Sequence, residues 1–94
     1  MNRAQITVVE DSFSIADRGT VVIGVWFDES QRLDVGDQIE VIQPDGKAFV
    51  THLTGVDFFT KCFGNTRNIG LLFGEITDKI QLPKGTTIWL LKNN

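Results

Sequence analysis

The stretch that decides the fold is FSIADRGTVVIG, residues 13–24. It holds two short apolar runs separated by Asp17-Arg18-Gly19, and the second run is rich in β-branched residues. The β-branched residues Val21, Val22 and Ile23 favour a pleated strand. Gly19 accepts a backbone conformation that most residues avoid. The pattern therefore predicts a β-hairpin with Gly19 in its turn.

Outside this hairpin the chain reads as further strands and turns. Strands are expected at residues 6–16, with a bend near Glu10 and Asp11, and at 20–28, 38–43, 48–59, 68–73 and 86–91. Pro-containing turns are expected at 44–46 and 83–85, and one helical turn at 60–64. Short strands at regular spacing predict an all-β fold, a closed or nearly closed antiparallel barrel that leaves few exposed strand edges.

Length and composition fit one ordinary globular domain spanning residues 1–94. The apolar fraction is 41% and the charged fraction 22%, which argues against disorder. No apolar run approaches the roughly 20 residues of a membrane helix. Residues 1–4 lack the apolar stretch of a signal peptide, and the single Cys62 cannot form an internal disulfide. We expect a cytoplasmic protein that does not bind membranes.

The charge pattern limits the partners. Twelve acidic and nine basic side chains give a net charge of −3, and the basic residues are scattered singly along the chain. Binding to long nucleic acids usually needs clustered Lys and Arg, so we do not expect it here. No G-x-x-x-x-G-K-[ST] loop occurs, so GTP binding is not expected either.

Catalytic and metal-binding patterns are absent from the sequence. His52 is the only histidine and lies within a predicted strand, and Cys62 has no neighbouring ligand residues. No serine lies in a G-x-S-x-G context. We therefore expect no enzyme activity, no metal site and no cofactor.

Several motifs in order resemble one known family. The chain resembles the β-barrel second domain of translation GTPases of the elongation factor Tu type, over about residues 6–91. The resemblance rests on residues 13–24 followed by LDVGDQIEV (33–41), TGVDFF (54–59), NIGLL (68–72) and LPKG (82–85). It implies a single-domain Greek-key antiparallel barrel, here without the GTPase domain. Fold alone does not fix function.

The resemblance also implies a site. In the family this domain holds the 3′-terminal adenosine and aminoacyl group of a charged tRNA. The equivalent positions here are Glu10, Asp11, Phe13, Asp57, Phe59, Asn68 and Gly70. Carboxylates would accept hydrogen bonds from a ribose hydroxyl or an ammonium group, and an aromatic ring would stack a base. The chain departs from the family at Thr60, which replaces a basic residue, and at residues 61–65 and 73–75.

The strand after Gly19 is apolar on both faces. By period-two geometry Val22, Gly24 and Trp26 point one way, and Ile23, Val25 and Phe27 point the other way. The family carries polar side chains at the second set, so the outer stripe here needs a cover. The candidates are the terminal segments 1–5 or 89–94, a second copy of the chain, or another protein. We favour a homodimer through Ile23, Val25 and Phe27.

The sequence therefore predicts a non-enzymatic binding or interaction module. Two classes stay open, namely a protein-interaction domain, and a translation accessory that recognises a tRNA 3′ end or docks on a ribosomal or GTPase partner. The predicted core contains Val22, Trp26, Ile39, Val41, Val56, Leu72 and Ile88.

Overall fold

The computed structural model describes residues 2–27, 31–60, 67–78 and 81–92. Within these ranges the chain forms strands and no α-helix, which confirms the all-β class. The eight strands are β1 (Asn2–Val8), β2 (Asp11–Ile15), β3 (Gly19–Val25), β4 (Gln38–Ile42), β5 (Ala48–His52), β6 (Gly55–Thr60), β7 (Arg67–Phe73) and β8 (Thr87–Lys92).

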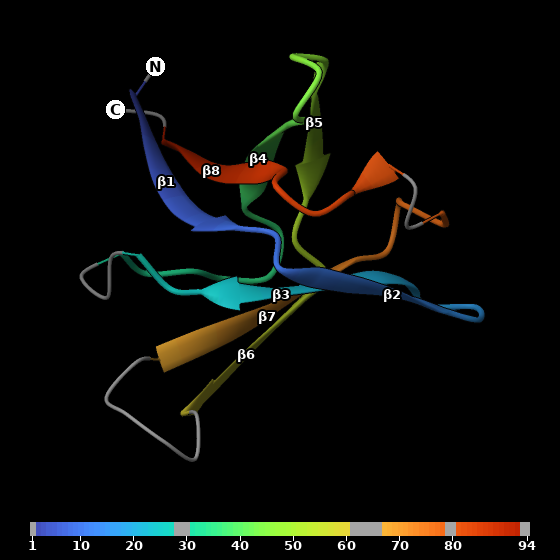
Figure 1. Cartoon of the computed structure of the whole chain (residues 1–94). Coiled ribbons are helices and arrows are strands. Elements are labelled where there is room, and N and C mark those ends of the chain that lie inside the picture. Colours follow the sequence, from blue (N-terminus) through green and yellow to red (C-terminus); the bar gives the residue numbers. More distant parts are fainter. Residues whose placement is uncertain (1, 28–30, 61–66, 79–80, 93–94) are drawn as a thin grey trace.

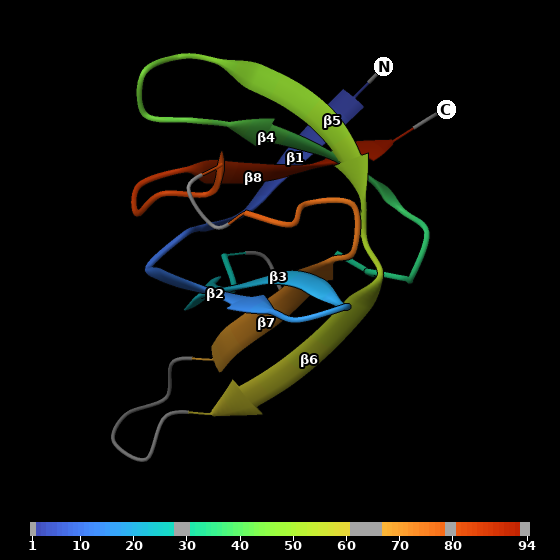
Figure 2. The same cartoon turned by 90° about the vertical axis from the view of Figure 1, so that its right-hand side faces the viewer.

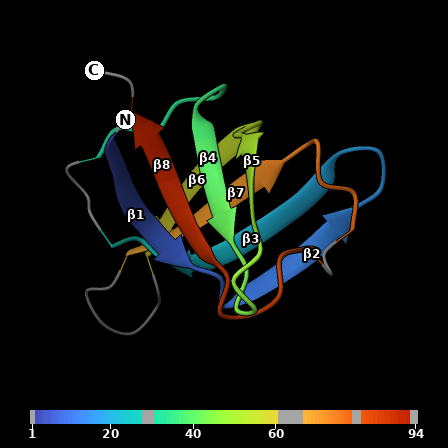
Figure 3. The same cartoon turned by 90° about the horizontal axis from the view of Figure 1, so that it is seen from above.

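The strands form two layers. The first sheet has the order β1-β8-β4-β5 and the second the order β2-β3-β7-β6, and all neighbouring strands are antiparallel. Figure 1 shows the first sheet above the second, and Figure 3 shows that the strands of the two layers cross. Neither sheet closes on itself, so the shell is barrel-like but consists of two open sheets facing each other.

Along the described strands the chain changes layer four times, and two of these passages are the bends that Figure 2 shows on opposite sides of the molecule. The first bend separates β1 from β2 at Val9 and Glu10, as the sequence predicted. The second separates β5 from β6, so the single strand predicted over residues 48–59 is wrong. Its cause is a change of partner: the Leu53 N–H donates to Asp37 in the first layer, and the Thr54 N–H donates to Leu72 in the second.

Gly24 marks the place where β1 crosses β3. The Phe27 N–H, two residues past the end of β3, donates to the Ile6 carbonyl of β1 at 2.8 Å and ties the two layers together. A Cβ atom at position 24 would collide with the Thr7 hydroxyl and the Val8 carbonyl. Only glycine therefore permits this close backbone approach.

The predicted turns are confirmed. In the β2–β3 turn the Arg18 N–H donates to the Ile15 carbonyl at 3.0 Å, with Asp17 at φ 64° and Gly19 at φ 116°. A Cβ atom on Gly19 would also collide with the Phe73 carbonyl, so two constraints select glycine there. The later turns are closed by bonds from Gly46 to Gln43 and from Thr86 to Pro83.

The core lies between the two sheets. Its fully buried apolar side chains come from both layers and from the connections, and they are Ile6, Val9, Val22, Ile39, Val41, Leu53, Ile69, Leu71, Phe73, Ile76, Leu82, Ile88 and Leu90. Of the predicted core, Val22, Ile39, Val41 and Ile88 are buried, and Trp26 and Val56 are partly buried against this cluster.

Leu72 is not a core residue, so that prediction is wrong. It lies opposite Val21 of β3 and Gly55 of β6, on the face of the sheet turned away from the core. Its neighbours Leu71 and Phe73 face inward, and alternation along β7 sends Leu72 outward.

Two further observations complete the fold. Thr60 is the last residue of β6, and the rest of the helical turn predicted over 60–64 lies outside the described residues. In the described part of the chain, no helix has the length and apolarity needed to span a membrane.

Candidate binding face

The side chains of the second sheet that point away from the core form one surface, which we call the outer face. Residues directly opposite on antiparallel strands share a face, so the pairing register defines its rows. One row runs across the four strands as Asp11, Ile23, Gly70 and Asp57. The next row runs as Phe13, Val21, Leu72 and Gly55.

The outer face is apolar at its centre and uncovered. Phe13 is 47% exposed and Ile15 42% exposed, while Val21, Ile23 and Leu72 are half-buried. No described element lies across this side of the sheet (Figures 1 and 2). The predicted alternation of β3 is confirmed, because Val22 and Gly24 are buried while Ile23 and Val25 point outward.

A hollow of about 560 Å³ lies on the outer face. Gly70 and Gly55 contribute no side chains, so the surface is low along β7 and β6. The hollow is lined by Ile15, Arg18, Val21, Ile23, Gly55, Val56, Asp57, Gly70 and Leu72. Its walls are therefore mostly aliphatic, with one guanidinium and one carboxylate among the lining groups.

The structure brings together most residues of the site that the resemblance implies. Asp11, Phe13, Asp57, Asn68 and Gly70 all lie on the outer face by register, in adjacent rows. Phe59 of β6 pairs with Asn68 of β7 along the backbone.

Glu10 lies apart from this group, in the bend between β1 and β2. Its N–H donates to the Ile23 carbonyl at 2.9 Å, and the residue lines a second hollow beyond the end of β3. Val25, Phe27 and Lys84 line the same second hollow. The predicted stripe of Ile23, Val25 and Phe27 is thus divided between two hollows.

Two residues of the site implied by the resemblance, Asp11 and Asn68, differ in whether their side-chain oxygens accept a hydrogen bond. The Asp11 carboxylate accepts a bond of 2.8 Å from the Ser12 N–H at the edge of the sheet. Asn68 is 3% exposed, and its amide oxygen has no hydrogen-bond partner within the described ranges. An unpaired buried oxygen costs free energy, so Asn68 is a position where the sheet is not optimised for stability.

The terminal segments do not cover the outer face, which corrects one of the predicted alternatives. Residues 2–5 belong to β1 and residues 89–92 belong to β8, and these strands pair with each other in the first sheet. Residues 2–5 and 89–92 therefore do not cover the stripe of Ile23, Val25 and Phe27.

Sequence reasoning missed Ile15, Arg18, Val21 and the outward position of Leu72. The alternation that placed Ile23 outward also places Val21 outward, and the hairpin pairing then adds Ile15 and Phe13. Arg18 carries no such signal, because a turn residue has no fixed face.

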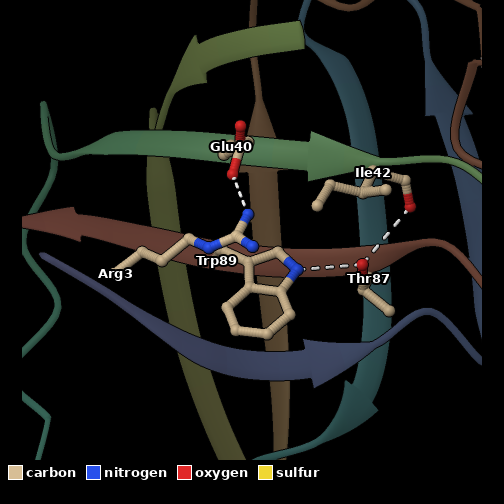
Figure 4. Close-up of polar contacts among 5 residues, drawn as sticks. All are labelled: Arg3, Glu40, Ile42, Thr87 and Trp89. Carbon is tan, nitrogen blue, oxygen red and sulfur yellow. Dashed lines mark hydrogen bonds and ion pairs between the residues drawn. The ribbon is translucent and has the colours of Figure 1, made fainter. Parts of the chain in front are cut away.

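On the first sheet, the surface that points away from the core differs from the outer face. Its aromatic side chain, Trp89, is covered by another side chain of the same sheet. Figure 4 shows Arg3 stacked on Trp89, with the guanidinium 4.5 Å from the ring centroid and bonded to Glu40. The Trp89 N–H donates to the Thr87 hydroxyl at 2.9 Å, and that hydroxyl donates to the Ile42 carbonyl. This cluster satisfies its own polar groups.

Among the described residues, the remaining titratable side chains form no recognisable catalytic arrangement. His52 Nδ1 lies 3.0 Å from Glu75 Oε1 at the surface, with the side chains 49% and 62% exposed. Within the residues that the structure describes, no three His, Cys, Asp or Glu side chains gather closely enough to hold a metal ion.

Comparisons with known proteins found no protein-family model and no solved structure that matches this chain.

Proposed function

We propose that this chain is a non-enzymatic protein-interaction domain whose binding surface is the outer face. The observation that carries this proposal is the apolar centre formed by Val21, Ile23 and Leu72 with the exposed Phe13 and Ile15. Contiguous apolar surface with a polar margin is typical of protein interfaces. A well-formed hollow within it offers a place for a partner's anchoring side chain.

We further propose that the domain is a Greek-key barrel of the type found as the second domain in translation GTPases. The motifs quoted above support this, since they occur in the family's order over nearly the whole chain. Two facing open sheets, with bends between β1 and β2 and between β5 and β6, are compatible with that type.

A second candidate function is capture of the 3′ end of a charged tRNA. The observation that favours it is the row in which Asp11 and Asp57 flank Ile23 and Gly70. Three strand spacings separate the two carboxylates, roughly 14 Å, and the exposed Phe13 ring lies in the next row. This width suits a nucleoside, whose base stacks on an aromatic ring while its hydroxyls meet a carboxylate.

A capture experiment tests the main proposal. Bait proteins are the wild type, Ile23→Lys on the outer face and Val50→Lys on the first sheet, where Val50 is 52% exposed. A partner specific to the outer face is retained by the wild type and by Val50→Lys, and lost by Ile23→Lys. Equal retention by both variants would contradict the proposal.

The tRNA-end candidate has its own test. Titration with an aminoacyl-adenosine mimic should shift the amide signals of Asp11, Gly70 and Asp57 before those of the first sheet. Unchanged spectra at millimolar mimic would remove this candidate and leave the protein-interaction proposal standing.

A further inference from the structure

Resting on the proposed function, we infer that the partner of the outer face is a second copy of this chain. The two copies stack outer face to outer face about a two-fold axis that lies in the interface and passes over Val21 and Leu72. In this arrangement Arg18 of each copy meets the partner subunit's Asp57.

Charge complementarity within the hollow supports a second copy of the chain as the partner. Arg18 and Asp57 both line the hollow, Arg18 from the β2–β3 turn and Asp57 from β6 on the far side of the sheet. Neither side chain makes an ion pair with another residue in the described ranges. A hollow with one cation and one anion at its opposite ends is self-complementary under a two-fold rotation.

The strand lattice fixes where the axis falls. β2, β3, β7 and β6 follow one another at spacings of about 4.8 Å, and successive rows are about 6.8 Å apart. The midpoint between Arg18, in the β2–β3 turn, and Asp57 on β6 lies between Val21 and Leu72. A two-fold axis that pairs Arg18 with the partner subunit's Asp57 passes through this midpoint. The charged pairs therefore form on both sides of an apolar centre.

The same rotation places large apolar side chains of one copy over smaller residues of the other. On this lattice Phe13 lies over the partner subunit's Ile23, and Ile15 lies over the partner subunit's Gly70. Two exposed apolar side chains, Phe13 and Ile15, are thereby covered, and the gap above Gly70 is filled.

The size of the face limits the strength of the dimer. Four strands and three rows span about 19 by 20 Å, or roughly 400 Å² in projection for each copy. Standard interfaces bury about 800 Å² per partner, so this dimer belongs to the weak class. We expect self-association to become measurable between about 10 μM and 1 mM.

A charge-swap mixing experiment tests the inference. Arg18→Asp places two carboxylates together at each contact, and Asp57→Arg places two guanidinium groups together, so each single variant should associate at least about tenfold more weakly. The double variant restores both pairs and should associate like the wild type. An equimolar mixture of the two single variants should form a mixed dimer, because both of its contacts pair opposite charges.

Sedimentation equilibrium from 10 μM to 1 mM provides the readout, with the thermal unfolding midpoint of each variant as the folding control. Arg18→Glu replaces Arg18→Asp if the latter lowers that midpoint. A wild type that stays monomeric at 1 mM, or single variants whose mixture does not associate, would overturn the inference. The capture experiment with Ile23→Lys can still succeed in that case, so failure of the dimer and failure of the interaction surface are distinguishable.

Discussion

At the scale of single residues, two buried threonines differ in their hydrogen bonding. The Thr20 hydroxyl donates to the Ile76 carbonyl at 2.8 Å, whereas the Thr51 hydroxyl has no partner among the described residues. Replacing Thr20 by the isosteric Val leaves a buried carbonyl unpaired and should lower the free energy of unfolding by about 1–3 kcal/mol. Thr51→Val removes an unpaired group and should be neutral or stabilising. Urea denaturation of both variants measures the contrast, and an equal loss in both would refute it.

The crossing of β1 over β3 makes Gly24 intolerant of a side chain. Gly24→Ala places a Cβ atom against the Val8 backbone, which cannot move without separating the layers, so we expect a loss of about 3 kcal/mol or more. Gly46 is the control, since it has φ 93° but open space around it. Gly46→Ala should lose only about 1 kcal/mol from backbone strain. Thermal unfolding tests the order, and a milder effect at Gly24 than at Gly46 would contradict it.

Trp26 combines a favourable ring contact with an unpaired polar group. Its ring centroid lies 4.4 Å from that of Phe58, and its indole N–H is buried without an acceptor in the described chain. Trp26→Phe keeps an aromatic contact and removes the unpaired N–H, so its cost should stay below about 1 kcal/mol. Trp26→Ala loses the contact and should cost about 3 kcal/mol. Equal losses in chemical denaturation would show that the indole N–H is satisfied.

At the scale of elements, the Arg3 side chain fastens the edge strand β1 to its sheet. It stacks on Trp89 of β8 and pairs with Glu40 of β4, with side chains 48% and 26% exposed in the ion pair. Partly exposed contacts of this kind contribute about 1 kcal/mol together. Arg3→Ala should therefore speed amide exchange in β1 by about fivefold and leave β7 unchanged. Uniformly faster exchange would mean that the whole fold, and not one strand, depends on Arg3.

The sequence predicted elements well where a local rule operates. The β2–β3 hairpin, the alternation of β3 and the turns at Gly46 and Gly85 follow from β-branched runs and from glycines with positive φ. The break between β5 and β6 was missed, because the sequence around Leu53 contains no strong turn signal. What ends β5 there is a change of hydrogen-bond partner, and that change is a tertiary event.

At the scale of the whole molecule, the candidate site could be predicted only in part. The resemblance brought Asp11, Phe13 and Asp57 to one surface, and the register confirms that they share a face. It also grouped Glu10 with them, whereas the bend after β1 turns that residue toward a separate hollow. Arg18 was missed because the orientation of a turn residue depends on the packing around it.

The openness of the outer face is the property on which the proposed function depends, and two phenylalanines of one sheet offer a matched test of it. Phe13 on the outer face is 47% exposed, and Phe58 is 44% exposed but lies on the opposite face beside Trp26. Because the two residues share chemistry and exposure, the difference in their reactivity reports on which face is covered.

Hydroxyl-radical footprinting compares the dilute protein with the protein at 1 mM, where the dimer is expected to form. We predict that Phe13 loses most of its reactivity in the concentrated sample, while Phe58 keeps the reactivity that it has in the dilute one. Unchanged reactivity of Phe13, or equal protection of Phe13 and Phe58, would contradict a dimer formed through the outer face.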